Sequence, residues 1–230
     1  MRPAFVAPPA STNRAAADRV EGRQRKRGQP KGSETTIVAR IDVTAAAENS
    51  LQHLRPADLS ERFRDPLGFI YTEHYRNRII CNTLDSAKPA QRLKLSTQEL
   101  EAIVEFYTID RPLHLADEEE SLFPLLRKRC KRSDNLPEIL ALLEAEHRSD
   151  QPLIDNVIDG LLSIIRHGAV ADPDLFAARC RAMSDFQRRH LAWENSVVMP
   201  LAKKRLSASD LVDLGRAMAE RRGITLDSDG

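Results

Sequence analysis

A twelve-residue block that occurs twice constrains this chain more than any other feature of its sequence. Residues 114–125 read HLADEEESLFPL and residues 190–201 read HLAWENSVVMPL, so six of twelve positions are identical without a gap. A Glu-His pair precedes each block, at residues 73–74 and 146–147. The duplication predicts two similar helical hairpins, related by a pseudo-twofold axis.

Helix-capping signals divide the chain after residue 65. Asp-Pro pairs at 65–66 and 172–173 offer an N-cap followed by Pro at the first helical position. Ser96 and Glu99 form a capping-box pattern. The expected helices cover residues 65–87, 96–130, 172–206 and 207–223, and a third helix in chain order begins at Asp134 or Pro137 and ends near residue 167. We therefore expect an all-α fold, an up-and-down four-helix bundle over residues 65–206 followed by a short extra C-terminal helix within 207–230.

Two prolines, Pro112 and Pro152, fall inside the expected helices. Proline lacks a backbone N–H and its ring collides with the preceding turn, so each proline either ends a helix or kinks it. Helical apolar spacing resumes directly after both residues. This pattern favours kinks.

Residues 1–50 differ in composition from the rest of the chain. They contain scattered prolines and a basic cluster, and their apolar periodicity is poor, which predicts a disordered basic tail. The cluster consists of Arg23, Arg25, Lys26, Arg27 and Lys31. Such a tail can contact nucleic acid or an acidic partner, but a solvated tail is the favoured interpretation.

Charge and cysteine content limit the partners and the cellular compartment that we expect for the protein. Lys and Arg number 35 against 34 Asp and Glu, so the overall charge indicates neither nucleic acid nor a membrane as partner. No apolar run reaches the ~20 residues that span a bilayer, and no secretory leader is evident. The three cysteines fit no disulfide framework. We expect a cytoplasmic protein, and the sequence does not set its oligomeric state.

The spacing of His and Glu within each block indicates metal binding. Residues i and i+4 lie on nearly the same helix face, about 6 Å apart, so both can reach a metal inside a bundle. A carboxylate can bridge two ions, whereas an imidazole binds one. Two bridging glutamates and four terminal histidines would make a dinuclear site. The candidate ligands are His74, His114, Glu118, His147, His190 and Glu194.

This ligand set favours a pair of iron ions. Each metal would receive two imidazole nitrogens and two carboxylate oxygens. A solvent-derived bridge would add a fifth ligand and leave one octahedral position open. Nitrogen and oxygen ligation without thiolate suits iron, with manganese as the second choice. Zinc is less suited because it usually settles for four ligands.

A ferritin-like carboxylate site is the competing interpretation. It requires Glu-x-x-His twice, and Glu144 with His147 matches once, but the position three before His74 is Tyr71. We therefore disfavour it. Asp150 is either an additional or water-mediated ligand or, as the pattern favours, a surface carboxylate.

Tyrosine and cysteine side chains share helix faces with the candidate ligands. Tyr71, Tyr107 and Cys81 can all point inward, and core packing is the favoured role for each of them. The two remaining histidines, His53 and His167, are expected to be ordinary surface residues.

The blocks, with their Glu118-Glu119 doublet and Leu-Phe-Pro at 122–124, resemble the hemerythrin-like (HHE cation-binding) domain family. The resemblance covers roughly residues 65–206. It implies a non-haem di-iron centre that reacts with dioxygen, nitric oxide or peroxide, or that senses iron. The family's metal-binding positions fall on His74, His114, His147 and His190, with bridging carboxylates at Glu118 and Glu194.

The chain departs from the oxygen-carrying hemerythrins at two points. Gln151 stands where they have a further histidine, and the last His and its carboxylate are four rather than five residues apart. This disfavours reversible oxygen carriage. The leading hypothesis is a protein that binds or senses dioxygen, nitric oxide or peroxide. The alternatives are a di-iron enzyme that consumes peroxide or nitric oxide, and an iron-buffering module.

Overall fold

The computed structural model describes residues 61–86 and 95–226, which form helices and short connections without a strand. The expected all-α class is confirmed. The tail at residues 1–50 and His53 lie outside the described residues. In chain order the elements are η1 (Glu61–Arg64), α2 (Pro66–Asp85), α3 (Thr97–Glu105), η2 (Phe106–Asp110), α4 (Arg111–Ala116), η3 (Asp117–Leu122), α5 (Phe123–Arg129), η4 (Arg132–Asp134), α6 (Leu136–Ser149), α7 (Gln151–His167), α8 (Pro173–Trp193), η5 (Glu194–Val198), α9 (Met199–Arg205) and α10 (Ala208–Arg221).

Helices α2, α3, α8 and α10 begin at the capping residues that the sequence predicts, whereas α6 begins at Leu136, after Asn135, and not at Asp134 or Pro137. The carboxylates of Asp65 and Asp172 each accept a hydrogen bond from the backbone N–H three residues on, at 3.0 and 2.9 Å. Ser96 and Glu99 form the expected capping box, and Ser207 begins a second one in front of α10. These bonds satisfy backbone donors that a helix leaves free in its first turn.

Within residues 61–86 and 95–226, three segments of π-helix interrupt the long helices, namely η2, η3 and η5. Each ends two residues before a proline, at Pro112, Pro124 and Pro200. The wider turn relieves the proline, which cannot donate and would collide with the preceding turn of an α-helix. Glu118 and Glu194 both lie in such segments, and their carbonyls accept the N–H of the residue five positions on. Both duplicated blocks therefore contain a π-helical turn that includes the glutamate.

The stretch from α6 to α7 bends at Asp150, two residues before Pro152. The backbone remains helical there. The N–H of Asp150 donates to the carbonyl of Glu146 at 3.0 Å, and its own carbonyl accepts from the N–H of Ile154 at 3.1 Å. Pro152 therefore kinks the helix without ending it, as expected.

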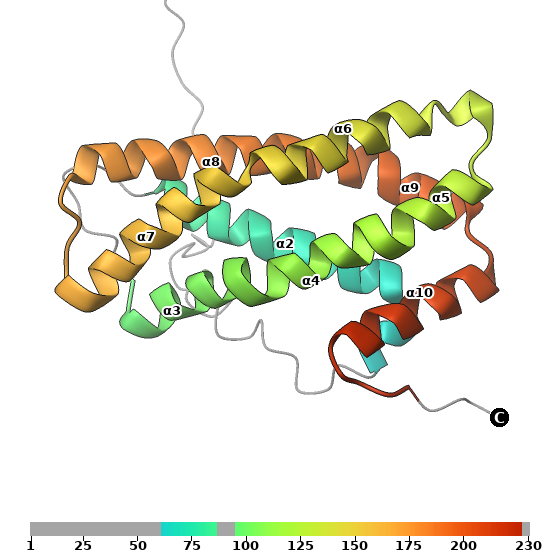
Figure 1. Cartoon of the computed structure of the whole chain (residues 1–230), viewed down its shortest axis with the longest axis horizontal. Coiled ribbons are helices and arrows are strands. Elements are labelled where there is room, and N and C mark those ends of the chain that lie inside the picture. The colour runs from blue at the N-terminus through green and yellow to red at the C-terminus, as the bar shows by residue number, and fades with distance from the viewer. Residues whose placement is uncertain (1–60, 87–94, 227–230) are drawn as a thin grey trace, which may run out of the picture. The chain divides into compact units, whose positions relative to one another are not determined.

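Four long helical stretches pack side by side around two apolar clusters (Figure 1). α2 and the α6–α7 stretch run from the first cluster to the second, whereas α3–α5 and α8–α9 run back. The first cluster includes Phe63, Leu67, Ile70, Leu122, Phe123, Leu126, Leu140, Leu143, Val198 and Met199. The second includes Ile80, Leu84, Leu100, Ile103, Phe106, Ile154, Val157, Leu161, Cys180 and Met183. All four stretches carry buried polar residues between the two clusters.

Helix α10 packs against η1, η3 and α2, and thereby closes the end of the first cluster. Gly215 lies where this helix approaches η1 most closely. A Cβ at this position would collide with the backbone carbonyl oxygen of Phe63. Only glycine permits this approach without a backbone shift.

The buried carboxylate of Asp210 anchors the start of α10. It accepts hydrogen bonds from Arg129 at 2.9 Å and from the backbone and hydroxyl of Ser207 at 2.8 and 2.7 Å. These bonds hold the pKa of Asp210 well below its usual range. A depressed pKa means that the carboxylate stabilises the fold above about pH 4, and that this contribution is lost progressively as the pH falls further.

Replacing Asp210 with Asn is therefore expected to lower the melting temperature by a few degrees at pH 7. The difference from the unaltered chain should shrink below about pH 4, where the carboxylate begins to protonate in the unfolded chain. Thermal denaturation followed by circular dichroism between pH 2 and 8 measures this. The matched control is Asp213→Asn on the same helix, because Asp213 is exposed. A difference that persists undiminished at pH 2 would contradict the role of the carboxylate.

Candidate metal centre

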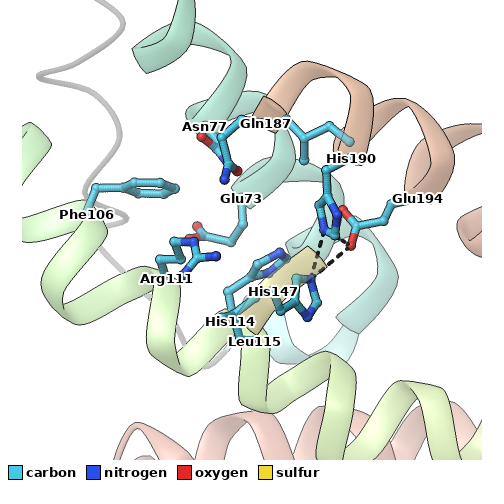
Figure 2. Close-up of a pocket in the computed structure, with 11 residues that line it drawn as sticks. Glu73, Asn77, Phe106, Arg111, His114, Leu115, His147, Gln187, His190 and Glu194 are labelled. Atoms are coloured by element: carbon cyan, nitrogen blue, oxygen red, sulfur yellow. Dashed lines mark hydrogen bonds and ion pairs between the residues drawn. The ribbon is translucent and has the colours of Figure 1, made fainter. Parts of the chain in front are cut away.

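The polar layer between the two apolar clusters contains all six candidate ligands. They come from α2, α4, η3, α6, α8 and η5, in the order His74, His114, Glu118, His147, His190 and Glu194. Each is nearly or fully buried. Figure 2 shows the side chains of His114, His147, His190 and Glu194 close to one another, with His190 and Glu194 coming from the same continuous helical stretch.

The six side chains form two groups, each from one hairpin. The first group is His74, His114 and Glu118, and the second is His147, His190 and Glu194; the ligand atoms of each lie within 4.8 Å of one another. In the second group the Nε2 atoms of the two histidines are 2.8 Å apart. Two nitrogens bound to one metal at about 2.0–2.1 Å lie at a similar separation, on the order of 3 Å. Both groups are therefore shaped to hold a cation.

The carboxylate of Glu118 reaches histidines of both groups. Its oxygens lie 3.4 Å from Nε2 of His74 and 3.6 Å from Nε2 of His114 in its own group. They also lie 3.6 Å from Nε2 of His147 in the other group. Glu118 therefore stands between the two groups.

Glu194 occupies the equivalent position in the second hairpin. Its oxygens lie 2.8 Å from Nε2 of His190 and 3.6 Å from Nε2 of His147. Its second oxygen lies 3.3 Å from Nε2 of His74, which belongs to the first group. Both carboxylates thus connect the groups, as the pseudo-twofold relation of the hairpins predicts.

Several polar atoms of this cluster lack a hydrogen-bond partner although they are buried. In the part of the chain that the structure describes, they are Nδ1 of His114, Oε2 of Glu118 and both carboxylate oxygens of Glu194. Burying such atoms unpaired costs roughly 1–3 kcal/mol each, and more when they are charged. A bound cation would offset this cost for the carboxylates, so the donor set fits a metal ion.

Proton affinities within the cluster are strongly perturbed. Burial opposes the charging of His74 and His190, but the carboxylates of Glu194 and Glu118, together with the hydrogen bonds to each ring, outweigh burial and raise the pKa of each to about 9. Burial, reinforced by the nearby His74, holds the pKa of His114 well below its usual range. In the absence of metal, the positive charge of the cluster therefore rests on only some of the histidines.

The pKa values of the two buried carboxylates, Glu118 and Glu194, are shifted in opposite directions. Burial and the charge of Glu194 raise the pKa of Glu118. Burial also opposes ionisation of Glu194, but His190 and His74 outweigh it, and the pKa of Glu194 falls well below its usual range. A cation that binds here must displace protons from the histidines, because only neutral imidazole can bind a metal.

Three of the four histidines are oriented by a hydrogen bond at Nδ1, away from the centre of the cluster. Nδ1 of His147 lies 2.7 Å from Glu119, and Nδ1 of His190 lies 2.8 Å from Glu146. Nδ1 of His74 lies 2.9 Å from the amide oxygen of Asn195. Partners of this kind fix the ring and raise its basicity as a ligand. These roles were not predicted from the sequence, although each partner is the direct neighbour of a candidate ligand in the chain.

A second layer of buried polar residues lies beside the cluster. Asn77 donates to Gln187 at 2.8 Å, Gln187 donates to Asp150 at 2.6 Å, and Arg111 donates to both oxygens of Asp150 at 2.7 Å. The positions follow the repeat, because Asn77 and Asp150 stand three residues after the first histidine of each hairpin. Asp150 is buried, so the expectation of a surface carboxylate was wrong, and it does not belong to either of the two groups of candidate ligands.

A small pocket leads from this second layer to the metal-ligand cluster. Its volume of about 10 Å³ is room for one water-sized molecule. Asn77, Arg111 and Gln187 line one side, and His114 and His190 line the other (Figure 2). The pocket therefore brings a small molecule next to both groups of ligands.

The other side chains that share faces with the ligands have structural roles. The hydroxyl of Tyr107 donates to Asn77 at 2.9 Å, and the buried thiol of Cys81 points to the same oxygen at 3.5 Å. Tyr71 packs against the first apolar cluster. Glu144 accepts a hydrogen bond from Arg127 at 2.7 Å on the surface, which removes the one match to a ferritin-like site.

Gln151 and His167 lie outside the cluster. Gln151 donates to Asp155 at 2.8 Å on the surface and accepts from Arg111 at 3.4 Å, so its side chain does not stand in for the missing histidine. His167 is exposed at the end of α7, as expected.

An all-α fold that buries two groups of histidines and carboxylates defines a metal-binding helical protein. Residues 65–202 match the model of the hemerythrin HHE cation-binding domain, and the chain belongs to this family. No curated protein sequence matches the chain. Among the described helices, none combines the length and apolarity needed to span a bilayer.

Proposed function

We propose that this protein is a non-haem di-iron protein that binds or senses dioxygen, nitric oxide or peroxide. Its domain extends over residues 65–206 as an up-and-down four-helix bundle, with the C-terminal helix and tail at 207–230. His74, His114 and Glu118 hold one iron, and His147, His190 and Glu194 hold the other.

The observation that carries this proposal is the position of the two glutamates between the groups. Each carboxylate lies within 3.6 Å of histidine nitrogens from both hairpins. A carboxylate that touches two metal-binding groups is placed to bridge two ions. A mononuclear site would need only one of the two groups, and would leave the other group's charges buried without compensation.

The chemistry of the donors favours iron. Four imidazoles and two carboxylates, without a thiolate, suit iron and, as second choice, manganese. The cysteines do not contribute, because Cys81 and Cys180 are buried outside both groups and Cys130 lies at the end of α5. All three thiols are unpaired, which fits a reducing compartment such as the cytoplasm.

The pocket supports a small ligand. Iron supplies the redox chemistry that dioxygen, nitric oxide and peroxide require. Asn77, Arg111 and Gln187 bring hydrogen-bonding groups to the pocket wall, and the hydrogen bonds among these residues and Asp150 hold that wall in place. A pocket of this size, with room for a water-sized molecule, favours a very small ligand.

Metal analysis and absorption spectroscopy of the aerobically purified chain test the proposal. We expect two irons per chain and near-ultraviolet charge-transfer bands of a coupled ferric pair. Substoichiometric metal that is unaffected by replacing His114, Glu118, His190 and Glu194 with Ala would overturn the assignment.

Addition of peroxide to the reduced protein separates the sensor from the enzyme. A single stoichiometric change of the absorption spectrum supports binding or sensing. Sustained consumption of peroxide under excess substrate would instead support the enzyme. Nitric oxide is tested in the same way under argon.

A further inference from the structure

The two groups of ligands differ in the residues that support their histidines. Glu119 and Asn195 occupy equivalent positions, each directly after the glutamate of its block. Each crosses to the other hairpin, where Glu119 pairs with His147 and Asn195 pairs with His74. The second group therefore receives a carboxylate where the first group receives a neutral amide.

The second equivalent pair is Glu73 and Glu146, and here too only the second group of ligands receives a carboxylate. Glu146 pairs with Nδ1 of His190 at 2.8 Å. By the repeat, Glu73 should pair with Nδ1 of His114, but that nitrogen is buried without a hydrogen-bond partner. Arg76 instead holds both carboxylate oxygens of Glu73, at 3.0 and 3.1 Å.

The residue three positions after each of these glutamates explains the difference. In the first hairpin it is Arg76, which also pairs with Asp110 at 2.7 Å. In the second hairpin it is Ser149, whose hydroxyl turns back to the carbonyl of Glu146 at 3.1 Å. The repeat also replaces Asp110 with Phe186. The carboxylate of Glu146 is thus available to His190, whereas that of Glu73 is held away from His114.

We infer that the two metal positions are unequal. The position formed by His147, His190 and Glu194 binds a divalent cation first and more tightly, and the position formed by His74, His114 and Glu118 binds second. This inference rests on the proposed function. Two carboxylates support the histidines of the tight position, whereas an amide alone supports those of the weak one. Loss of one such partner typically lowers metal affinity 10–100-fold.

Anaerobic titration of ferrous iron into the metal-free full-length chain tests this inference. Calorimetry, with the free metal checked by equilibrium dialysis, should show two steps whose dissociation constants differ at least about tenfold. Glu146→Gln and Glu119→Gln should each weaken the first step about tenfold or more and leave the second step unchanged. Glu144→Gln is the matched control, because Glu144 lies on the same helix and pairs with Arg127 on the surface.

A variant that binds the metal more tightly is a useful test, because misfolding does not increase metal affinity. Arg76→Ser should release Glu73 to His114 and tighten the second step about tenfold. The double variant Arg76→Ser/Glu73→Gln should lose this gain, which separates the effect of Glu73 from the simple loss of a positive charge. Arg78→Ser, an exposed arginine of the same helix, should leave both steps unchanged.

The outcomes for this inference differ from those for the proposed function. A chain that binds no iron contradicts the proposed function. Two irons bound with equal affinity, or a Glu146→Gln variant that weakens only the second step, leave that function standing and overturn the inequality. Failure of Arg76→Ser to tighten the second step also overturns it.

Discussion

Replacing Glu194 with Gln is expected to abolish binding of the metal pair. The carboxylate touches His74 in one group and His190 in the other, so its loss removes a ligand from both positions. Glutamine has nearly the same volume but no charge to offset that of a cation. Metal analysis of the purified variant should therefore find neither iron, rather than one of the two.

The same variant should lose the stabilisation that metal gives the fold. A ligand present at about a thousand times its dissociation constant stabilises a protein by about 4 kcal/mol. In a domain of this size that corresponds to a melting temperature about 10 °C higher. A strong chelator should lower the melting temperature of the unaltered chain by this amount and leave Glu194→Gln unchanged.

Glu120→Gln is the control for this prediction. Glu120 follows the first His-Glu pair in sequence, but it is exposed and pairs with Arg221. This variant should keep the metal and the response to chelator. If Glu194→Gln retained two metal ions and the full thermal shift, Glu194 would not be a ligand.

Removing the carboxylate of Asp150 is expected to destabilise the metal-free protein. Asp150 is 1% exposed and Arg111 is 4% exposed, and two hydrogen bonds of 2.7 Å join them. In Asp150→Ala the guanidinium stays buried without its counter-ion, and Gln187 loses its acceptor. Breaking a buried pair from one side costs about 3–5 kcal/mol. The melting temperature of the apoprotein should therefore fall by about 10 °C.

Two further variants show whether this loss comes from the stranded charge. Asp155→Ala changes an exposed carboxylate of α7 and should have little effect. The double variant Asp150→Leu/Arg111→Met removes both charges and should recover most of the lost stability, since apolar replacements of buried ion pairs are often neutral. Urea denaturation of the metal-free proteins measures the differences. A double variant as unstable as Asp150→Ala would show that packing, not charge, is decisive.

Much of the helical framework follows from local sequence. Asp65, Ser96, Asp172 and Ser207 start helices in the structure because each satisfies free backbone donors within three or four residues of itself. Contacts between residues so close in the chain can be predicted from the sequence. The kink at Pro152 is predictable for the same reason. Membership of the hemerythrin HHE family is confirmed, whereas the ligand set stays a prediction that the geometry supports.

The surroundings of the ligands were not predictable, because they depend on neighbouring helices. Glu146 looks like a surface residue on its own helix, and only the approach of α8 brings it to His190. Asp150 looks like a surface carboxylate in the sequence because nothing local indicates that Arg111, 39 residues earlier, would be buried beside it. The repeat does contain information about such positions. Equivalent positions such as Asn77 and Asp150 share a place in the polar layer.

The π-helical segments make two short stretches of this gene intolerant of length changes. A π turn contains one residue more than an α turn, so deleting one residue between Glu194 and Pro200 would restore the shorter turn. Pro200 would then collide with the preceding turn, as a proline does inside a regular α-helix. An insertion of one residue would rotate every residue beyond it by about 100° relative to the ligands. The same holds between Glu118 and Pro124. Substitutions can accumulate in these stretches during evolution, but insertions and deletions should be absent from functional relatives.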